Sequence, residues 1–177
     1  MCIRDSYLTE KEQQRLLRVC KSDSNLHDVV LLALLTGARR GEICGLRWRD
    51  VDLKNRTVTF VQTKNGEIRK VPLSDQAIAL LRCRFSQRVK GMNDWVFPAE
   101  KSEGPVDVSH RFGRYAKKAG LEDFRFHDLR HSAASAMARA GVPERQMQEV
   151  LGHKSVAMTK RYTHLRPSEL DGAVALS

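Results

Sequence analysis

The 177-residue chain carries 31 lysine and arginine residues against 21 aspartate and glutamate residues, a formal net charge of +10, with 41% hydrophobic residues. These values indicate one globular domain, or one domain with appendages, and the positive charge favours a polyanionic partner, nucleic acid before an anionic membrane, unless it serves solubility alone. The longest apolar run, VVLLALL at 29–35, is too short to cross a bilayer, and no basic-then-apolar signal peptide opens the chain, so we expect neither a membrane span nor export.

Residues 1–73 predict two helices, a helical turn and a β-hairpin. Thr9 followed by Glu12 is a capping-box pattern, which indicates the start of the first helix. The predicted elements are, in chain order, a helix to about residue 21, an apolar helix from 25 or 26 to about 36, a helical turn over 40–46, and strands over 56–62 and 67–73. The two strands are rich in β-branched residues and flank Asn65-Gly66, which is the strongest short-range signal for a hairpin.

Residues 74–177 predict mostly helices. Ser74 can cap a helix to about residue 88, with Ile78, Leu81 and Phe85 on its buried face. The remaining predicted elements are a loop over 89–106 that places 95–97 in the core, and helices over 107–119, 127–140, 143–151 and 155–165. In the helix over 127–140 we expect four residues to be buried, namely Leu129, Ala133, Ala136 and Met137. The predicted fold class is mainly α with a small antiparallel β-sheet (α+β).

Several polar residues stand in short motifs along the chain. Arg39 lies in TGARRGE, Lys64 precedes the Asn-Gly turn, His153 ends LGH, and Tyr162 follows nine residues later in KRYTHL. HDLRHS, at 127–132, places two histidines and an arginine three and four residues apart, which makes them neighbours on one face of a helix. Each residue taken singly is more often structural or solvated than catalytic, so only their combination carries a functional prediction.

TGARRGE, the hairpin lysine, HDLRH, LGH and YTHL, in this order, resemble the catalytic domain of the tyrosine recombinases, the phage integrase family. The resemblance covers about residues 7–165, and several separate motifs agree in identity, order and spacing. It implies the fold of a DNA breaking-rejoining enzyme's catalytic domain and site-specific DNA recombination, as integration or excision. In the implied reaction a tyrosine attacks a phosphodiester, leaving a 3′-phosphotyrosyl bond and a free 5′-hydroxyl. One ester replaces another, so we expect no ATP or other cofactor.

The resemblance also implies a role for each residue of these motifs. The implied catalytic residues are Tyr162 as the nucleophile, Arg39 and Arg130 as phosphate ligands, Lys64 as general acid for the 5′-oxygen, His127 in proton transfer from the tyrosine, and His153 as a donor to a phosphate oxygen. Forked guanidinium donors match the charge that gathers on a phosphate during attack, and a phenol with a pKa of about 10 must lose its proton. A histidine suits that proton transfer because it titrates near neutral pH.

Other residues are expected to support the site or to bind DNA. We expect Glu42 and His131 to hold neighbouring groups in place, although Glu42 would equally suit the positive end of a helix dipole. The expected DNA-binding residues are Arg40, Lys64, Lys154 and Lys160. No carboxylate pair has the placement of a two-metal nuclease, and the two histidines of HDLRH do not form HExxH, so we expect no metal. The cysteines form no CxxC pair and are expected to be reduced intracellular thiols.

The predicted organisation is a leader over 1–6 that is not native sequence, a catalytic domain over 7–166, and a tail over 167–177 that either packs onto a neighbouring protomer or frays. We expect the N-terminal core-binding domain, with which this family clamps DNA, to be absent, and DNA affinity to be weak and salt-sensitive as a result. The expected partners are double-stranded DNA and further copies in a homotetramer on DNA, without a membrane or a small-molecule substrate. The expected location is cytoplasmic, at the nucleoid.

Two alternatives to recombination stay open at this point. VPERQMQEVLGHKSVAMTKRY also resembles a helix-turn-helix loosely, which would suit a DNA-binding module without catalysis. That alternative leaves the ordered motifs with Arg39 and Lys64 unexplained. A type IB topoisomerase-like enzyme would share the chemistry but relax DNA instead of exchanging strands, and LGH followed by Tyr162 favours the recombinase.

Overall fold

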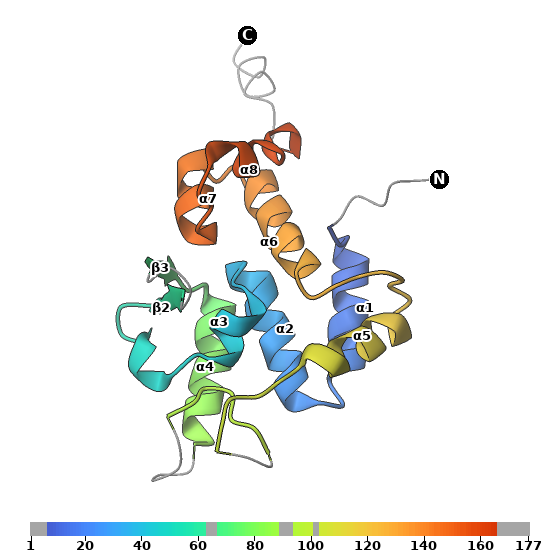
Figure 1. The fold of residues 1–177 in the computed structure, drawn as a ribbon, viewed down its shortest axis with the longest axis vertical. Helices are drawn as coiled ribbons and strands as arrows, with labels where there is room; N and C mark the ends of the chain where they lie inside the picture. The colour runs from blue at the N-terminus through green and yellow to red at the C-terminus, as the bar shows by residue number, and fades with distance from the viewer. Residues whose placement is uncertain (1–6, 63–66, 89–93, 101–102, 166–177) are drawn as a thin grey trace.

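The structure, a computed structural model, describes residues 7–62, 67–88, 94–100 and 103–165 (Figure 1). The helices are α1 Glu10–Cys20, α2 Ser24–Thr36, α3 Arg40–Cys44, α4 Asp75–Ser86, α5 Ser109–Lys118, α6 Asp128–Arg139, α7 Glu144–Leu151 and α8 Val156–Lys160, with 3-10 turns η1 Trp48–Asp50 and η2 Thr163–Leu165. The strands are β1 Val51–Asp52, β2 Thr57–Gln62 and β3 Glu67–Pro72. This architecture confirms the predicted fold class. Among the described helices none is long and apolar enough to span a membrane.

Local capping interactions explain where the first two helices begin. Thr9 Oγ1 accepts a hydrogen bond from the Glu12 amide, and the Glu12 carboxylate accepts one from the Thr9 amide at 2.9 Å, which confirms the predicted capping box. Helix α2 begins at Ser24, one residue before the predicted range, because the Asp23 carboxylate accepts a hydrogen bond from the Leu26 amide at 3.0 Å.

The three strands form one antiparallel sheet in the order β1-β2-β3. The predicted hairpin is confirmed in its strands, and the register pairs Phe60 with Arg69 and Val61 with Ile68. Strand β1 was not predicted, since two residues are too few to show the alternation that identifies a strand. The hairpin turn with Lys64 lies outside the described residues, as do the predicted leader over 1–6 and the tail over 167–177.

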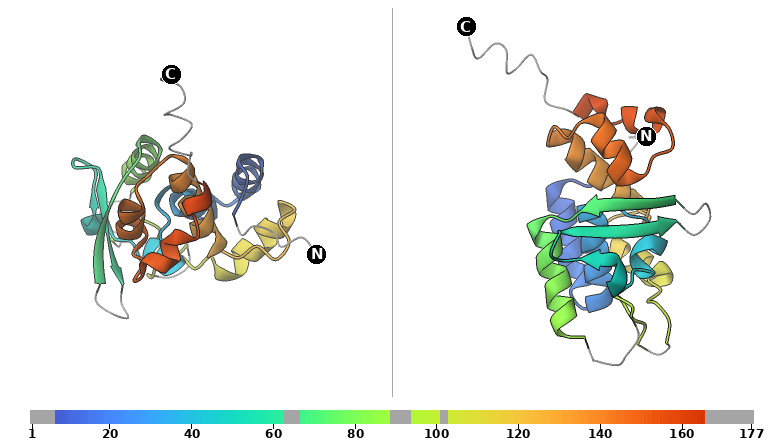
Figure 2. Two further views of the ribbon diagram at one scale, coloured as in Figure 1. Left: turned by 90° about the horizontal axis from the view of Figure 1, so that it is seen from above. Right: turned by 90° about the vertical axis from the view of Figure 1, so that its left-hand side faces the viewer.

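Helix α2 forms the centre of the molecule (Figure 1). Its apolar residues Val29, Val30, Leu32 and Ala33 are fully buried, which explains why this helix shows no polar stripe in the sequence. Figure 1 shows α1 and α5 on one side of α2 and α4 with the sheet on the other, while Figure 2 shows the sheet lying across one side of the helices. Helix α6 packs on α2 and leads to α7 and α8.

The structure corrects two predictions of buried faces. Phe85 was expected in the core with Ile78 and Leu81, but its side chain is exposed and is covered partly by the edge of the Trp48 ring. It lies in the last turn of α4, where the helix ends and few neighbours remain. In α6, Ala136 is exposed, whereas other small residues of the helix, Ala134 and Ala138, are buried together with the predicted Leu129 and Ala133. This helix packs against α2 on one side and against α7 on another, so its buried face is wider than the prediction.

The helix predicted over 155–165 is interrupted. Helix α8 ends at Lys160 and the 3-10 turn η2 begins at Thr163, so Tyr162 lies between two short elements rather than inside a continuous helix. The amide of Tyr162 still donates to the Thr159 carbonyl at 3.0 Å, and its own carbonyl accepts from the Leu165 amide at 3.0 Å. Both bonds span three residues, as in the tighter winding of a 3-10 turn.

Gly37 is expected to be one of the least replaceable residues of the fold. Its φ is +65°, and a Cβ atom would lie 2.5 Å from Cδ2 of the fully buried Leu151 side chain, which would have to shift. We expect Gly37→Ala to lower the free energy of unfolding by about 3 kcal/mol, from left-handed strain and overpacking together. Gly141 has a similar φ of +74° with nothing within 4 Å, so Gly141→Ala should cost about 1–2 kcal/mol. Urea unfolding measures both, and equal losses would contradict the packing argument.

Candidate active site

Arg39 is placed by the sharp turn between α2 and α3. Helix α2 ends at Gly37 in a left-handed conformation, and α3 begins directly after Arg39. The carboxylate of Glu42 accepts a hydrogen bond from the Arg39 amide at 2.6 Å and one from Arg39 Nη1 at 3.2 Å. Glu42 therefore both caps α3 and holds the Arg39 side chain, so the two roles considered for it in the sequence are present together.

Arg130 is the most deeply buried charge of the predicted site, with 4% of its surface exposed. Its guanidinium donates to the Gly37 carbonyl at 2.9 Å and to the Leu151 carbonyl, which lie at the C-terminal ends of α2 and α7. Helix C-termini carry partial negative charge, which favours a cation there. Burial, reinforced by the charges of Arg39 and Arg69, lowers the pKa of Arg130 to about 10, so the guanidinium is still protonated at neutral pH.

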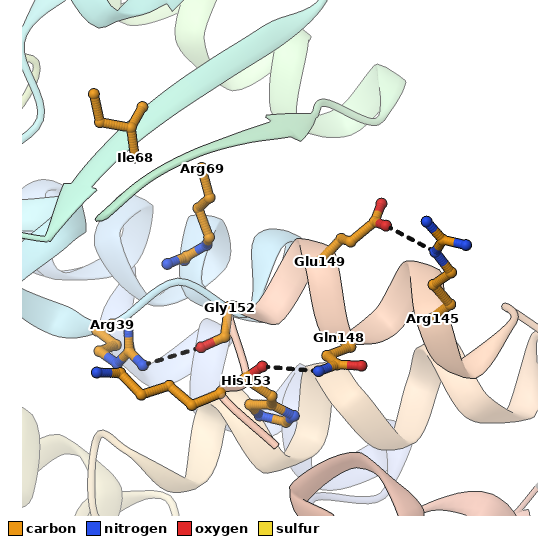
Figure 3. Close-up of a pocket in the computed structure, with 9 residues that line it drawn as sticks. Arg39, Ile68, Arg69, Arg145, Gln148, Glu149, Gly152 and His153 are labelled. Atoms are coloured by element: carbon orange, nitrogen blue, oxygen red, sulfur yellow. Dashed lines mark hydrogen bonds and ion pairs between the residues drawn. The ribbon is translucent and has the colours of Figure 1, made fainter. Parts of the chain in front are cut away.

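A pocket of about 410 Å³ lies where α7, β3 and the turn before α3 meet (Figure 3). Arg39 and His153 line it, and Figure 3 shows Arg39 in contact with the Gly152 carbonyl, next to His153. The other residues that line it are Ile68, Arg69, Arg145, Gln148, Glu149, Gly152 and Lys154. A pocket with several cationic groups and a histidine suits an anion such as a phosphate.

His153 is presented by a left-handed turn at the end of α7. Gly152 has a φ of +64°, and the next residue turns its ring toward Thr159, whose Oγ1 lies 2.8 Å from His153 Nδ1. Burial first, and then the charges of Arg130 and Arg39, lower the pKa of His153 to about 4, so the ring is neutral at pH 7. With the Thr159 hydroxyl as the donor, the neutral ring carries its hydrogen on Nε2, which leaves a donor for a phosphate oxygen.

The low pKa of His153 predicts that the protein loses stability in mild acid. In the unfolded chain His153 binds a proton below its ordinary pKa of 6.5, whereas in the folded chain it does so only near pH 4. The neutral ring therefore contributes its whole stabilisation above pH 6.5, and this contribution falls as the pH drops. We expect the His153 contribution to fall by about 2 kcal/mol between pH 7 and pH 5.

Urea unfolding at the two pH values measures this loss. His153→Gln should flatten the dependence, whereas replacement of the exposed His110 by glutamine should leave it as in the wild type. An unchanged dependence in His153→Gln would contradict the burial argument.

Tyr162 is buried in a small apolar cluster with Ala134 and Ala138 of α6 and Met147 and Leu151 of α7. Its hydroxyl is hydrogen-bonded to Nδ1 of His131. Burial raises the pKa of the phenol, and the nearby charges of Arg161 and Arg130 offset this only in part, so the phenol is neutral at pH 7. A nearby base is therefore needed if this oxygen is to attack anything.

His131, rather than His127, contacts the tyrosine. His127 is the residue just before α6 and is exposed, whereas His131 lies one turn further along the helix, beneath Tyr162. The two imidazole rings meet edge-on with their centroids 5.4 Å apart. The pKa of each histidine is lowered, first by loss of contact with water, which at the exposed His127 is only partial, and then by neighbouring positive charge, so both rings are neutral and able to accept a proton.

The structure thus brings the predicted residues into two adjoining groups. Arg39, His153 and Lys154 line the pocket, and His127, His131 and Tyr162 surround the start and upper face of α6. Arg130 lies near members of both groups, since its charge lowers the pKa values of His127, His153 and Tyr162. Arg40 and Lys160 are exposed and are not among the described residues that line the pocket, and Lys64 lies outside the described residues.

One residue of the site, Arg69, was not predicted. It lies in β3, lines the pocket and forms an ion pair with Glu42. The signal was present in the sequence, because alternation along EIRKVP places Arg69 on the same face as the buried Val71. An arginine on the inner face of a strand needs an acidic or hydrogen-bonding partner, so this pattern predicts a buried polar contact at Arg69. Among the described residues no cluster of three or more histidine, cysteine, aspartate or glutamate residues could hold a metal.

Comparison with known proteins confirms the resemblance seen in the motifs. The family model described as "Phage integrase family" matches residues 6–169. The integrase of Salmonella phage P22 is 36% identical over 180 residues, which cover 93% of this chain and 45% of the relative. The crystal structure of XerA recombinase has a TM-score of 0.78 at 31% identity, covering 96% of this chain and 62% of that one.

A second solved structure, the catalytic domain of bacteriophage HP1 integrase, has a TM-score of 0.73 at 30% identity, covering 96% of this chain and 93% of that one. The chain spans about half the length of the curated relatives it matches. The match of the family model over nearly the whole chain, together with the order of the site residues, shows that the chain belongs to the phage integrase family.

Proposed function

We propose that this protein is the catalytic domain, over residues 7–166, of a site-specific recombinase that cuts and rejoins DNA through a 3′-phosphotyrosyl intermediate. The observation that carries the proposal is the convergence around Arg130. Arg39 and His153 line an anion-sized pocket near this arginine, and the hydroxyl of Tyr162, whose pKa the charge of Arg130 also lowers, meets His131. The family relationship and the net charge of +10 support DNA as the substrate.

The scissile phosphate is proposed to bind in the pocket beside Arg39 and His153. Each guanidinium offers forked donors that match phosphate oxygens, and the His153 Nε2–H adds a neutral donor. Arg130, already fixed by the carbonyls of Gly37 and Leu151, adds positive charge without having to reorganise during the reaction. Fixed donors of this kind stabilise the charge that develops on the phosphate in the transition state.

The proposed reaction balances its protons through two groups. The Tyr162 oxygen forms a bond to phosphorus while the bond from phosphorus to the 5′-oxygen breaks. The phenol proton passes to His131, which already receives its hydrogen bond, with His127 as the neighbouring ring that can take part. The departing 5′-oxygen needs a proton in return, and Lys64, which lies between β2 and β3 in the sequence, is proposed to supply it. A 5′-hydroxyl from another strand then reverses these steps.

The proposed partners follow from the chemistry of exchange. Each cleaved strand occupies one tyrosine, and each chain carries one Tyr162, so exchange between two duplexes requires several copies. We propose a homotetramer on double-stranded DNA, working in the cytoplasm at the nucleoid, with Arg40, Lys154 and Lys160 contacting the DNA backbone. A core-binding domain that is not part of residues 7–166 is proposed to complete the clamp on DNA.

Trapping of a covalent adduct on nicked DNA tests this function. A pool of duplexes with a randomised centre carries a nick just 3′ of the randomised stretch and a label at the 5′ end of the strand to be cut. We expect a labelled band that survives denaturing electrophoresis and disappears after protease treatment. DNA retention at low salt without any adduct would support the binding-module alternative. Relaxation of supercoiled plasmid without exchanged strands would support the topoisomerase-like one.

A further inference from the structure

Glu42 contacts two arginines, and the contact with Arg69 is the stronger. Arg69 Nη1 and Nη2 donate to the two oxygens of the Glu42 carboxylate at 2.5 and 2.9 Å. Arg39 reaches the same carboxylate with one side-chain nitrogen, at 3.2 Å. The side chains of Glu42 and Arg69 are 6% and 12% exposed, against 31% for Arg39. A forked, buried contact is stronger than a single, more exposed one, so Arg69 neutralises most of the Glu42 charge.

Arg69 is itself held from three directions. Its Nε donates to the Val150 carbonyl at 2.9 Å, and its guanidinium lies 5.0 Å from the centre of the Phe60 ring on the neighbouring strand. It also covers the turn before His153, since a Cβ atom built on Gly152 would lie 3.1 Å from Arg69 Cδ. Figure 3 shows the side chain extending from β3 toward the backbone of Gly152. Arg69 therefore connects the hairpin, the end of α7 and Glu42.

Glu42 lies where its negative charge can hold the Arg39 guanidinium away from a bound phosphate, and Arg69 reduces this competition. A buried carboxylate next to a phosphate pocket competes with the phosphate for the guanidinium of Arg39. While Arg69 occupies both oxygens of Glu42, Arg39 keeps donors free, and its Nη2 lies 3.5 Å from the Gly152 carbonyl at the pocket. Without Arg69, Arg39 would be the remaining ion-pair partner of Glu42 among those described, and its guanidinium would be drawn toward the carboxylate.

We propose that Arg69 is a positioning residue for strand cleavage, which holds the Glu42 carboxylate and so leaves the Arg39 guanidinium available to the scissile phosphate. The inference rests on the proposed function. It distinguishes Arg69 from a residue that merely stabilises the fold, because the harm done by losing Arg69 comes from the charge left on Glu42. Removing that charge as well should therefore restore part of the activity.

The test compares Arg69→Met with the double variant Arg69→Met/Glu42→Gln in single-turnover adduct formation at saturating nicked DNA. We expect the single variant to be slower than the wild type by about tenfold to a hundredfold, as for other misplaced phosphate ligands. The double variant should recover several-fold over the single one, because a neutral amide in place of the carboxylate no longer draws Arg39 away. Rates are compared at equal folded fraction, measured by circular dichroism.

Arg84 provides a matched control. It is 14% exposed, donates through Nε to the Val96 carbonyl, pairs with Asp28 and Asn25, and lies 4.6 Å from the centre of the Phe97 ring. These contacts resemble those of Arg69, but they join α4 to α2 and to the segment over 94–100 and do not lie at the pocket. Arg84→Met should therefore lose stability without slowing the folded protein. Should Arg69→Met fail to fold, Arg69→Lys replaces it, with and without Glu42→Gln.

Strand β3 follows Lys64 closely in the sequence, so Arg69→Met could also slow the reaction through Lys64. A second substrate distinguishes an effect through Arg39 from an effect through Lys64. A 5′-bridging phosphorothiolate leaves as a thiolate that needs no proton, so it restores variants that act through the general acid. We expect it not to restore Arg69→Met. With an active wild type, three results would each overturn the inference. They are restoration of the Arg69→Met rate by the phosphorothiolate, a loss of rate in folded Arg84→Met equal to that in Arg69→Met, and no recovery of rate in Arg69→Met/Glu42→Gln. A wild type that forms no adduct would instead overturn the proposed function, and this inference with it.

Discussion

Tyr162→Phe is expected to abolish the covalent protein–DNA adduct while leaving DNA binding unchanged. The phenylalanine ring fills the same space against Ala134 and Met147, and only the hydroxyl that His131 contacts is lost. The cost in stability should be about 1 kcal/mol, that of one hydrogen bond. Adduct formation on nicked duplexes and electrophoretic retention of the same duplexes measure the two properties separately.

Tyr115 supplies the control for this replacement. Its hydroxyl lies 3.3 Å from Ser22 Oγ, in α5 and away from the pocket, so Tyr115→Phe removes an equivalent group elsewhere. Adduct formation by Tyr115→Phe should match the wild type. An adduct formed by Tyr162→Phe at the wild-type rate would show that another residue is the nucleophile.

Arg130→Lys is expected to slow adduct formation by about a hundredfold to a thousandfold, the usual cost of losing one fixed transition-state donor. Lysine keeps the charge but not the fork that reaches the carbonyls of Gly37 and Leu151 at once. The carbonyl that loses its donor stays buried, so the free energy of unfolding should also fall, by about 1–3 kcal/mol. Single-turnover rates at saturating DNA and urea unfolding measure these two effects.

A second arginine on the same helix, Arg139, separates the local effect from a general one. It is exposed at the end of α6, where its guanidinium lies 4.8 Å from the centre of the Tyr7 ring. Arg139→Lys should therefore change neither the rate nor the stability measurably. If Arg130→Lys behaved in the same way, the placement of Arg130 at the centre of the site would be wrong.

The elements that were predicted correctly are those with local causes. The capping box at Thr9 and Glu12 and the strands around the Asn-Gly pair depend on interactions within a few residues, which a sequence displays directly. The sequence also predicted that His127, Arg130 and His131 are neighbours, because residues three and four apart lie on one face of a helix. Arg39 and His153 line one pocket, and the catalytic roles that the order of the motifs implies for them stay predictions.

The features that were missed depend on contacts between distant segments. The ion pair of Arg69 with Glu42 joins residues 27 positions apart. The local sequence indicates only that an arginine lies on the inner face of a strand, not which residue it contacts. The contact of Tyr162 with His131 joins residues 31 positions apart in α6 and in the segment between α8 and η2. The resemblance implied proton transfer to His127, and spacing alone placed both histidines near the arginine without showing which ring meets the phenol.

Mapping the amino acid that becomes attached to DNA tests the central claim most directly. The trapped adduct is digested with a nuclease and with trypsin, which cuts after Arg161 but not at the Arg166–Pro167 bond, and the peptide that carries the remaining nucleotide is identified by mass spectrometry. The convergence described above predicts a nucleotide linked through its 3′-phosphate to Tyr162 in the peptide that begins YTHLRPSEL. A nucleotide attached to any other side chain, or a protein that retains DNA but never yields such a peptide, would contradict it.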